Sequence, residues 1–342
     1  MKQNKPSIKN VALKAGVSPS TVSNYLNNSA PVNTITGERI EKVIQELGYI
    51  PNNIARSLRY GRTKDIGVVI TEIENSFYAS VINGMEEVAS KNNYSIILAC
   101  NIYDFEREKR QIYNLVSRGI AGIIFASGSN MDLELINDLQ RRKILIVAVD
   151  RKLPKADIPS VAVDNFKAVY KGITYLINCG HRNLYYLSEP LVMDTLIDRF
   201  EGYKKALKDN GLEYDESKIL INKGLQTNIP QTSYELMSNV IHEIEKPAAI
   251  FASSDYFTFG AIKAVFDNGF KVPDDISFMG FDNINLSPYF YPSLTTIKQP
   301  KRHMGRVAMQ LMLDLINRKK IATKKIILNT TLIERDTVLK LN

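Results

Sequence analysis

From Asp65 onward, hydrophobic runs of strand length alternate with amphipathic stretches of helical length. Eight runs have the apolar character of buried strands: Ile66–Ile70, Ser95–Ala99, Gly122–Phe125, Leu145–Val149, Ser160–Val163, Leu184–Leu187, Ala248–Ala252 and Ile276–Gly280. The segments between them have helical spacing: Ala79–Asn92, Phe105–Ser117, Met131–Arg141, Asn165–Asn178, Arg199–Asn210, Ser233–Glu243 and Thr258–Asn268. Continuous Val, Ile and Leu runs separated by helices are typical of parallel sheets with helices on both faces. The pattern therefore predicts an α/β core.

These elements are more numerous than one sheet usually holds, so we expect two lobes. The chain is predicted to cross between the lobes near Asp164 and to return near Pro292, with a helix over Met304–Asn317 and a strand over Ile326–Glu334. The N-lobe would span about 64–163 plus 293–322, and the C-lobe about 164–292 plus 323–342. Sheets of this kind bind ligands at the carboxyl ends of their strands, which places a ligand in the cleft between the lobes.

The first 50 residues have a different pattern, that of a small helical domain. Between Ile8 and Leu26, an apolar stripe of Val11, Ala12 and Ala15 is followed by Gly16, which suits a helix end, and by Ser18 and Pro19, which suit a helix start. Val22 and Leu26 would then face inward, with these polar residues facing outward: Ser20, Thr21, Ser23, Asn24 and Asn27. A third helix is predicted over Thr36–Leu47, ending at Gly48. A short helix with a polar outer face, held against a first helix, suits a DNA major groove.

Residues 51–63 are predicted to be a hinge between the helical domain and the core at 64–342. Asn53–Leu58 is long enough for one or two helical turns only. A helix of that length is marginal in isolation, so we expect it to become ordered only when a partner holds it.

The charge distribution separates DNA binding from an ordinary helical hairpin. Residues 1–64 contain ten Lys or Arg and three Glu, which is +7 of the net charge of +8 for the whole chain. Positive charge confined to one small segment is typical of phosphate contact rather than of general solubility. The sequence therefore favours a nucleic-acid-binding headpiece over the hairpin.

Composition restricts the remaining classes of protein. The chain is 44% hydrophobic and 23% charged, as in ordinary globular proteins, and apolar runs such as Ala121–Ala126 are too short to span a membrane. No signal-peptide pattern precedes the first helix, so a cytoplasmic protein is expected. Cys100 and Cys179 lie in apolar surroundings and are expected to be buried reduced thiols.

Catalytic chemistry is not expected. The sequence has no phosphate-binding G-x-x-x-x-G-K motif, no G-x-S-x-G elbow, no H-E-x-x-H and no cysteine cluster, and its three histidines are scattered. His181 is interpreted as structural. We therefore expect no enzyme, no cofactor and no metal site. A transport-type binding protein is disfavoured too, because it would need a signal peptide and would lack the basic headpiece.

Several blocks together resemble the lactose-repressor (LacI/GalR) family of bacterial transcription regulators. They are I-K-N-V-A-L-K-A-G-V-S-P-S-T-V-S at 8–23, L-G-Y-I-P-N-N-I-A-R-S-L-R-Y-G-R-T at 47–63, I-G-V-V-I-T-E-I-E-N-S-F-Y at 66–78, V-D-R at 149–151, R-F-E-G-Y-K-K-A-L at 199–207, S-D-Y-F-T-F-G at 254–260 and M-G-F-D-N at 279–283. The resemblance covers nearly the whole chain. It implies a helix-turn-helix headpiece, a hinge helix, and a core like that of periplasmic sugar-binding proteins that dimerises and binds a small effector.

The resemblance also implies DNA contacts. By similarity, Leu58 in the hinge would wedge between base pairs in the minor groove, a deformation that flanking contacts must offset; a packed residue is the alternative. Many members have Arg where this chain has Asn24, and Asn pairs with adenine whereas Arg prefers guanine. The full set of expected DNA contacts is Ser7, Ser18, Pro19, Ser20, Thr21, Ser23, Asn24, Asn27, Tyr49, Asn52, Asn53, Ala55, Arg56 and Leu58.

Carried over residue by residue, the family's effector contacts fall on positions that follow strand ends. They are Phe77, Tyr78, Asp150, Arg151, Arg199, Ser254, Asp255 and Asp282. Carboxylates, a guanidinium and aromatic rings together suit a sugar. Other roles stay open for some of these residues: a structural Arg199–Asp282 bridge, a surface charge at Arg151, a helix cap at Asp255 and plain core at Phe77. Ser254 stands where many members have Asn, which leaves the identity of the effector open.

The predicted function is a repressor that binds a palindromic double-stranded DNA operator as a homodimer, under control of a small effector, a sugar or sugar derivative. A global catabolite regulator controlled by a phosphorylated carrier protein, and a purine-type co-repressor binder, are the alternatives. The chain has no leucine-heptad helix at its end, which favours a dimer over a tetramer.

Overall fold

The computed structural model describes residues 6–27, 30–49, 63–101, 104–126, 133–151, 156–224 and 229–341. The chain divides into two compact units, Met1–Thr63 and Lys64–Asn342. The division falls where the predicted hinge ends, and each unit is described below by itself.

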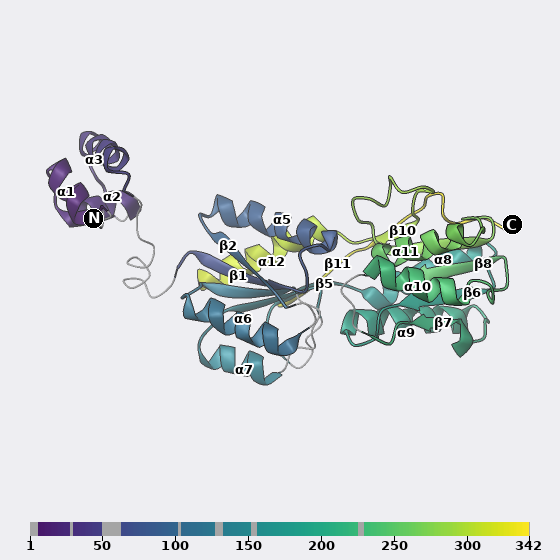
Figure 1. Ribbon diagram of the computed structural model, residues 1–342. Helices are drawn as coiled ribbons and strands as arrows, with labels where there is room; N and C mark the ends of the chain where they lie inside the picture. Colours follow the sequence, from purple (N-terminus) through teal and green to yellow (C-terminus); the bar gives the residue numbers. More distant parts are fainter. Residues whose placement is uncertain are drawn as a thin grey trace. The chain divides into compact units, whose positions relative to one another are not determined.

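The first unit holds the three predicted helices, α1 (Ile8–Ala15), α2 (Pro19–Asn27) and α3 (Thr34–Leu47) (Figure 1). Gly16 ends α1 with a left-handed φ of 62°, a conformation that glycine adopts without steric cost. Helix α3 begins two residues before the predicted start because the Asn33 side chain caps it, accepting a hydrogen bond of 2.9 Å from the Ile35 N–H. The small core consists of Val11, Ala12, Ala15, Val22, Ile40 and Val43.

The N-lobe of the second unit is built on a six-stranded parallel sheet of order β11-β5-β4-β3-β1-β2. Its strands are β1 (Asp65–Ile70), β2 (Ser95–Cys100), β3 (Gly122–Ala126), β4 (Ile146–Val149), β5 (Ser160–Val163) and β11 (Lys325–Leu328). Helices α5 (Ser76–Lys91) and α12 (Lys301–Ile316) cover one face, and α6 (Phe105–Ser117) and α7 (Leu133–Arg141) cover the other (Figure 1).

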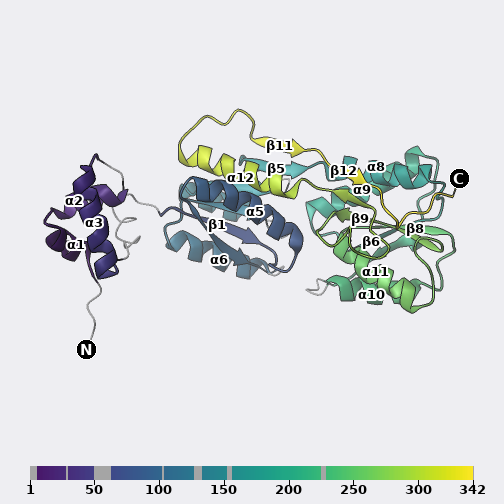
Figure 2. The ribbon, with the colours of Figure 1, turned by 90° about the horizontal axis from the view of Figure 1, so that it is seen from above.

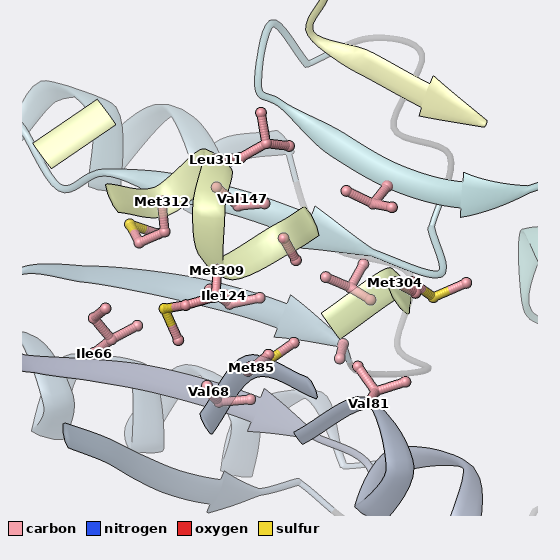
Figure 3. Packing of buried hydrophobic residues seen from close by; sticks show 14 of the residues in the cluster. Ile66, Val68, Val81, Met85, Ile124, Val147, Met304, Met309, Leu311 and Met312 are labelled. Atoms are coloured by element: carbon pink, nitrogen blue, oxygen red, sulfur yellow. The ribbon is translucent and has the colours of Figure 1, made fainter. Parts of the chain in front are cut away.

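Methionines of α12 fill the space between that helix, α5 and the sheet. Met304, Met309 and Met312 are fully buried and belong to one cluster with strand residues such as Val68 and Ile124 (Figure 3). Helices α5 and α12 approach closely enough to require glycine at their contact. A Cβ at Gly305 would lie 1.9 Å from the Val81 carbonyl oxygen, and one at Gly84 would lie 2.0 Å from the Arg302 carbonyl oxygen.

The C-lobe repeats this architecture with a sheet of order β12-β10-β9-β8-β6-β7, in which only the β10–β12 pair is antiparallel. Its strands are β6 (Leu184–Ser188), β7 (Ile219–Ile221), β8 (Ala248–Ala252), β9 (Ile276–Asp282), β10 (Thr296–Lys298) and β12 (Thr331–Ile333). Helices α8 (Asn165–Asn178) and α9 (Asp194–Asp209) pack on one face, and α10 (Ile229–Val240) and α11 (Asp255–Asp267) on the other. Figure 2 shows the two lobes from above.

The predicted return from the C-lobe near Pro292 is wrong by several residues. Strand β10 still pairs with β9 of the C-lobe, and the first N-lobe element after it is α12, so the chain crosses back at 299–300. The single strand predicted over Ile326–Glu334 is two strands, because β11 pairs with β5 in the N-lobe and β12 pairs with β10 in the C-lobe. The lobe boundary expected between residues 292 and 293 therefore lies at about 299–300. The one expected between residues 322 and 323 lies at 329–330, between β11 and β12.

Several helices of the core begin three to five residues before their predicted starts, as at Ser76, Asp194 and Lys301. Each of these three helices begins with a polar residue, so the apolar periodicity alone does not mark where it starts. Strands β7 and β10 are missing from the prediction because each has only three residues and β10 includes Thr296 and Lys298.

Candidate functional site

The first unit presents one end of helix α2 to solvent. Ser18 caps the helix as predicted, because its Oγ accepts a hydrogen bond of 3.1 Å from the Thr21 N–H. The same oxygen lies 2.6 Å from Ser20 Oγ and 2.8 Å from Thr21 Oγ1, which forms a cluster of three hydroxyls. Pro19 and Ser20 are exposed, while Thr21, Ser23 and Asn24 are half-buried. The start of α2 thus offers hydroxyl groups that can donate or accept hydrogen bonds.

The opposite side of α2 is held against α3 by Tyr25. Its hydroxyl donates a hydrogen bond of 3.1 Å to Glu41 Oε2, and its ring covers Gly37, where a Cβ would lie 2.9 Å from Tyr25 Cε2. Helix α1 is joined to α3 by an ion pair of 2.8 Å between Lys14 and Glu46. These contacts fix the orientation of α2 within the unit.

The remaining residues expected to contact DNA differ in what the structure describes. Ser7 caps α1 in a reciprocal arrangement with Asn10, and the half-buried Tyr49 packs against the three-helix core. The side chain of Asn27 lies outside the described residues, and so do Asn52, Asn53, Ala55, Arg56 and Leu58. Their roles stay predictions.

The second unit contains a pocket to which both lobes contribute. It encloses about 560 Å³, counting its open mouth, and seven of the eight expected effector contacts line it. Its lining consists of Asn75, Phe77, Tyr78, Ala126, Asp150, Arg151, Glu189, Met193, Thr195, Leu196, Arg199, Ser254 and Asp282. The fold therefore brings together in this pocket residues that are up to 207 positions apart in the sequence, from 75 to 282.

Asp150 follows β4 and has a left-handed backbone, with φ of 54°. Its Oδ1 is buried and has no hydrogen-bond partner within the described part of the chain. Burial is the main reason why the pKa of Asp150 rises to about 7, and nearby Asp282 adds to the increase while Arg199 opposes it. A buried carboxylate oxygen without a donor is costly unless a ligand supplies one.

Arg199, on α9, is buried among specific partners. Its Nε donates a hydrogen bond of 2.8 Å to Asn165 Oδ1, and its Nη1 donates one of 2.6 Å to the Ser253 carbonyl oxygen. The guanidinium carbon lies 3.7 Å from the centre of the Phe281 ring, which is cation–π geometry. Arg199 is therefore positioned rigidly at the pocket wall by groups other than Asp282.

Asp282 ends β9 and has its own set of contacts. Its Oδ1 accepts a hydrogen bond of 2.8 Å from Gln299 Nε2, and its backbone carbonyl accepts one of 2.7 Å from Lys301 Nζ. Burial raises the pKa of Asp282, although the charges of Arg199 and Lys301 work in the opposite direction. Arg199 and Asp282 are thus each held by contacts to other groups rather than by an ion pair with each other.

Arg151 is not a surface charge. It is 4% exposed, and its Nε lies 3.4 Å from Asp194 Oδ1, so an N-lobe residue pairs with the start of α9 in the C-lobe. On the N-lobe wall, the rings of Phe77 and Tyr78 meet edge to face with centres 5.3 Å apart, and the Tyr78 hydroxyl lies 3.1 Å from Thr71 Oγ1. Aromatic and charged groups therefore alternate around the pocket.

Asp255 is the one expected effector contact that does not line the pocket, and it does not cap α11 either. Ser254 is the cap, since its Oγ accepts a hydrogen bond of 3.2 Å from the Phe257 N–H. The Asp255 carboxylate is fully buried and accepts hydrogen bonds from the Ile284 N–H at 2.8 Å, from Ser287 Oγ at 2.5 Å and from Thr296 Oγ1 at 2.6 Å. Its role is to hold the 284–296 segment.

Glu189 is the most important pocket residue that the sequence analysis missed. It comes directly after β6, so it follows a strand end as Asp150 does, although the residues carried over from the family did not include it. Its Oε2 accepts a hydrogen bond of 2.9 Å from Ser253 Oγ, and burial raises its pKa. Asn75, whose side chain caps α5, and Thr195, at the start of α9, were missed too.

Other candidate chemistry in the described residues is structural. His181 is buried, and its Nε2 lies 3.0 Å from the Leu339 carbonyl oxygen, a contact that ties down the final segment. Cys179 is buried and Cys100 is half-buried, and both are free thiols. The described part of the chain has no grouping of His, Cys, Asp or Glu suited to a metal ion. Within the same residues, every helix is too short or too polar to cross a bilayer.

Two family models match almost the whole chain. The model described as "Bacterial regulatory proteins, lacI family" matches residues 7–52, and the one described as "Periplasmic binding proteins and sugar binding domain of LacI family" matches residues 63–336. The chain belongs to the lacI family. The predicted family and fold class are thereby confirmed, and the protein is a DNA-binding transcription regulator with an effector-binding core.

Full-length relatives agree with this assignment. The HTH-type transcriptional regulator RegA of Clostridium acetobutylicum is 38% identical over 334 residues, which cover 96% of this chain and 98% of RegA. Catabolite control protein A of Priestia megaterium is 34% identical over 318 residues, which cover 92% of this chain and 93% of that protein.

Solved structures show the same architecture. The complex of the transcriptional regulator CelR with cellobiose has a TM-score of 0.72 and 26% identity, covering 97% of this chain and 99% of CelR. The Lac repressor dimer bound to operator and the anti-inducer ONPF has a TM-score of 0.86 and 24% identity, covering 98% of this chain and 100% of that chain, and shows the shared fold.

Proposed function

We propose that this lacI-family regulator represses transcription by binding, as a homodimer, a palindromic DNA operator, and that a sugar or sugar derivative in the pocket of the core controls this binding. The protein would act in the cytoplasm, and the core would bind its ligand without converting it. The observation that carries the effector half of the proposal is the pocket, where side chains from both lobes converge around an unpartnered Asp150 oxygen.

The DNA half rests on the first unit. Its three helices leave the hydroxyl cluster of Ser18, Ser20 and Thr21 at the start of α2, and the excess positive charge of the chain lies in the same segment. Phosphate contacts give affinity, and side chains in the major groove give sequence preference. Asn24 on α2 is the proposed base reader.

Contacts between the lobes supply a route for control. The Tyr256 hydroxyl of the C-lobe accepts a hydrogen bond of 3.4 Å from the Ser76 N–H and donates one of 3.3 Å to the Glu74 carbonyl oxygen, both in the N-lobe. The Arg151–Asp194 pair joins the lobes at another point. A ligand that contacts both lobes changes their preferred spacing only if it binds one spacing better than the other.

A homodimer is supported by large hydrophobic residues that a monomer would leave in water. Leu286, Tyr289 and Tyr291 lie on one segment of the C-lobe and are 58%, 85% and 90% exposed. Exposed apolar residues grouped in this way are typical of protein contacts. Light scattering on the full chain measures this directly, and a monomeric mass at micromolar concentration would contradict the dimer.

The proposed function is tested in two steps with the full chain. A binding selection from random double-stranded DNA should recover a palindrome, and recovery of no common sequence would refute repression through an operator. A thermal-shift screen should then find a sugar that stabilises the core and changes operator affinity, since a ligand of the native state raises its stability by mass action. The bound sugar should be recovered chemically unchanged. Purine bases form a separate arm, and stabilisation by a purine alone would replace the sugar proposal.

A further inference from the structure

The pocket is lined by several acidic side chains. Of the residues that the structure describes, three carboxylates line it, Asp150 from the N-lobe and Glu189 and Asp282 from the C-lobe, together with the two guanidinium groups of Arg151 and Arg199. A fourth carboxylate, Asp194, lies beside Arg151. Among the described residues, acidic side chains therefore outnumber basic ones at the pocket, although the chain as a whole carries +8.

Both pocket cations already have protein partners. Arg199 donates to Asn165 and to the Ser253 carbonyl and stacks on Phe281, while Arg151 pairs with Asp194. An anionic ligand would have to compete with these contacts. A phosphate group, in contrast to a hydroxyl, brings only acceptor oxygens and a charge of −1.5 to −2 at neutral pH, in the general range for phosphomonoesters.

Helix N-termini at the pocket do not supply an anion site either. Such termini bind anions through free N–H groups. Here Asn75 accepts the hydrogen bond from the Phe77 N–H, Asp194 accepts that of Thr195, and Ser254 accepts that of Phe257. The chain's own side chains therefore cap the starts of α5 and α11, and at the start of α9 the Asp194 carboxylate accepts one of the N–H groups.

The carboxylate acceptors of the pocket have unused hydrogen-bonding capacity. Asp150 Oδ1 has no partner among the described residues. The Glu189 carboxylate accepts a side-chain hydrogen bond from Ser253, and the Asp282 carboxylate accepts one from Gln299. An ionised carboxylate can accept about four hydrogen bonds. Hydroxyl groups of a ligand are the donors that match this surplus.

From these contacts we propose that the pocket selects an unphosphorylated polyhydroxy compound and rejects its phosphorylated counterpart, with Glu189 as the residue that excludes the anion. This inference rests on the proposed sugar-binding function and narrows it. Glu189 suits the excluding role because its charge faces the pocket while its hydrogen bond to Ser253 fixes its position. Asp150 and Asp282 would bind the hydroxyls.

The experiment compares matched ligand pairs by isothermal titration calorimetry on the full chain. The pairs are glucose and glucose 6-phosphate, ribose and ribose 5-phosphate, fructose and fructose 1-phosphate, and trehalose and trehalose 6-phosphate. We expect at least one neutral sugar to bind and its phosphorylated counterpart to bind at least about ten times more weakly, which corresponds to about 1.4 kcal/mol.

Two variants distinguish exclusion of the phosphorylated ligand by Glu189 from a general loss of ligand binding. Glu189→Gln should raise the affinity for the phosphorylated counterpart about tenfold while changing that for the neutral sugar by less than about threefold. Glu213→Gln removes the same charge from an exposed C-lobe side chain that does not line the pocket, and it should change neither affinity. Equal loss of both ligands in Glu189→Gln would show a structural role and overturn the assignment of Glu189.

The outcomes for the wild-type chain distinguish the two proposals. Equal or tighter binding of a phosphorylated sugar would overturn the exclusion of anions and leave the sugar-binding function standing. Binding of no sugar from either set would contradict the sugar-binding function itself, and the inference would fall with it.

Discussion

Asp150→Asn should make the ligand-free core more stable at pH 8 while weakening its response to the effector. The pKa of Asp150 rises from its ordinary value of 3.8 to about 7, mainly through burial, so the folded state resists ionisation of this carboxyl. Each pKa difference of one corresponds to about 1.4 kcal/mol, which gives a ceiling of about 4 kcal/mol at pH 8. Asn removes the charge, keeps the shape and tolerates the left-handed φ of 54° at this position.

The raised pKa of Asp150 also determines the direction in which the stability of the core changes with pH. A carboxyl with a raised pKa in the folded state binds its proton more tightly there than in the unfolded state, so its effect on stability worsens as the pH rises from about 4 to about 7. The advantage of Asp150→Asn should therefore shrink to about 2 kcal/mol at pH 5. Asp274→Asn, at an exposed carboxylate of the C-lobe, is the matched control and should change stability by less than about 0.5 kcal/mol at either pH.

Urea unfolding of the full chain at pH 5 and pH 8 measures this difference. The chain has no tryptophan, so far-UV circular dichroism is the suitable signal, and the transition of the core is fitted separately from that of the headpiece. A second measurement is the increase in melting temperature caused by the effector, which should be smaller in Asp150→Asn. An equal gain at both pH values, or no gain at pH 8, would refute the argument from burial.

Three further predictions concern the headpiece and the core. Asn24→Arg should move the preference at one position of each operator half-site from adenine to guanine in a binding selection, and an unchanged preference at every position would exclude Asn24 as a base reader. Ser18→Ala removes the cap of α2, costs about 1 kcal/mol of headpiece stability, and should weaken binding to all operator variants by a similar factor in a fluorescence-anisotropy titration. Gly305→Ala would place a Cβ 1.9 Å from the Val81 carbonyl oxygen and should destabilise the core by at least about 1–3 kcal/mol in thermal unfolding; a wild-type melting temperature would contradict the close helix contact.

The architecture of the core was largely predictable because parallel strands buried on both faces leave continuous apolar runs. The strands Ser160–Val163 and Ala248–Ala252 have the predicted bounds. The path of the final segment was not predictable, since β11 and β12 are joined by only two residues and belong to different sheets. Hydrophobic periodicity indicates that a segment is extended, but it does not indicate which sheet it joins.

The candidate site, too, could be predicted only in part from the sequence. The family resemblance supplied Asp150 and Asp282, and both obey the rule that ligand-binding residues follow strand ends. The same rule covers Glu189 in the run S-E-P, which the resemblance did not include. The rule fails at Asp255, which shares a strand end with Ser254. Only the packing decides between these neighbours, because the partners of Asp255 lie 29 to 41 residues further along the chain, at Ile284 to Thr296.

The acidity of the pocket bears directly on how an effector could move the lobes. Burial disfavours the ionised forms of Asp150, Glu189 and Asp282, so these groups destabilise the arrangement that brings them together. A donor-rich ligand reverses this effect, because its hydroxyls stabilise the ionised carboxylates. Asp150 belongs to the N-lobe, whereas Glu189 and Asp282 belong to the C-lobe. The stabilisation that the ligand provides therefore depends on the spacing of the lobes. Such a ligand therefore binds one spacing better than another, which is the differential affinity that allosteric control requires.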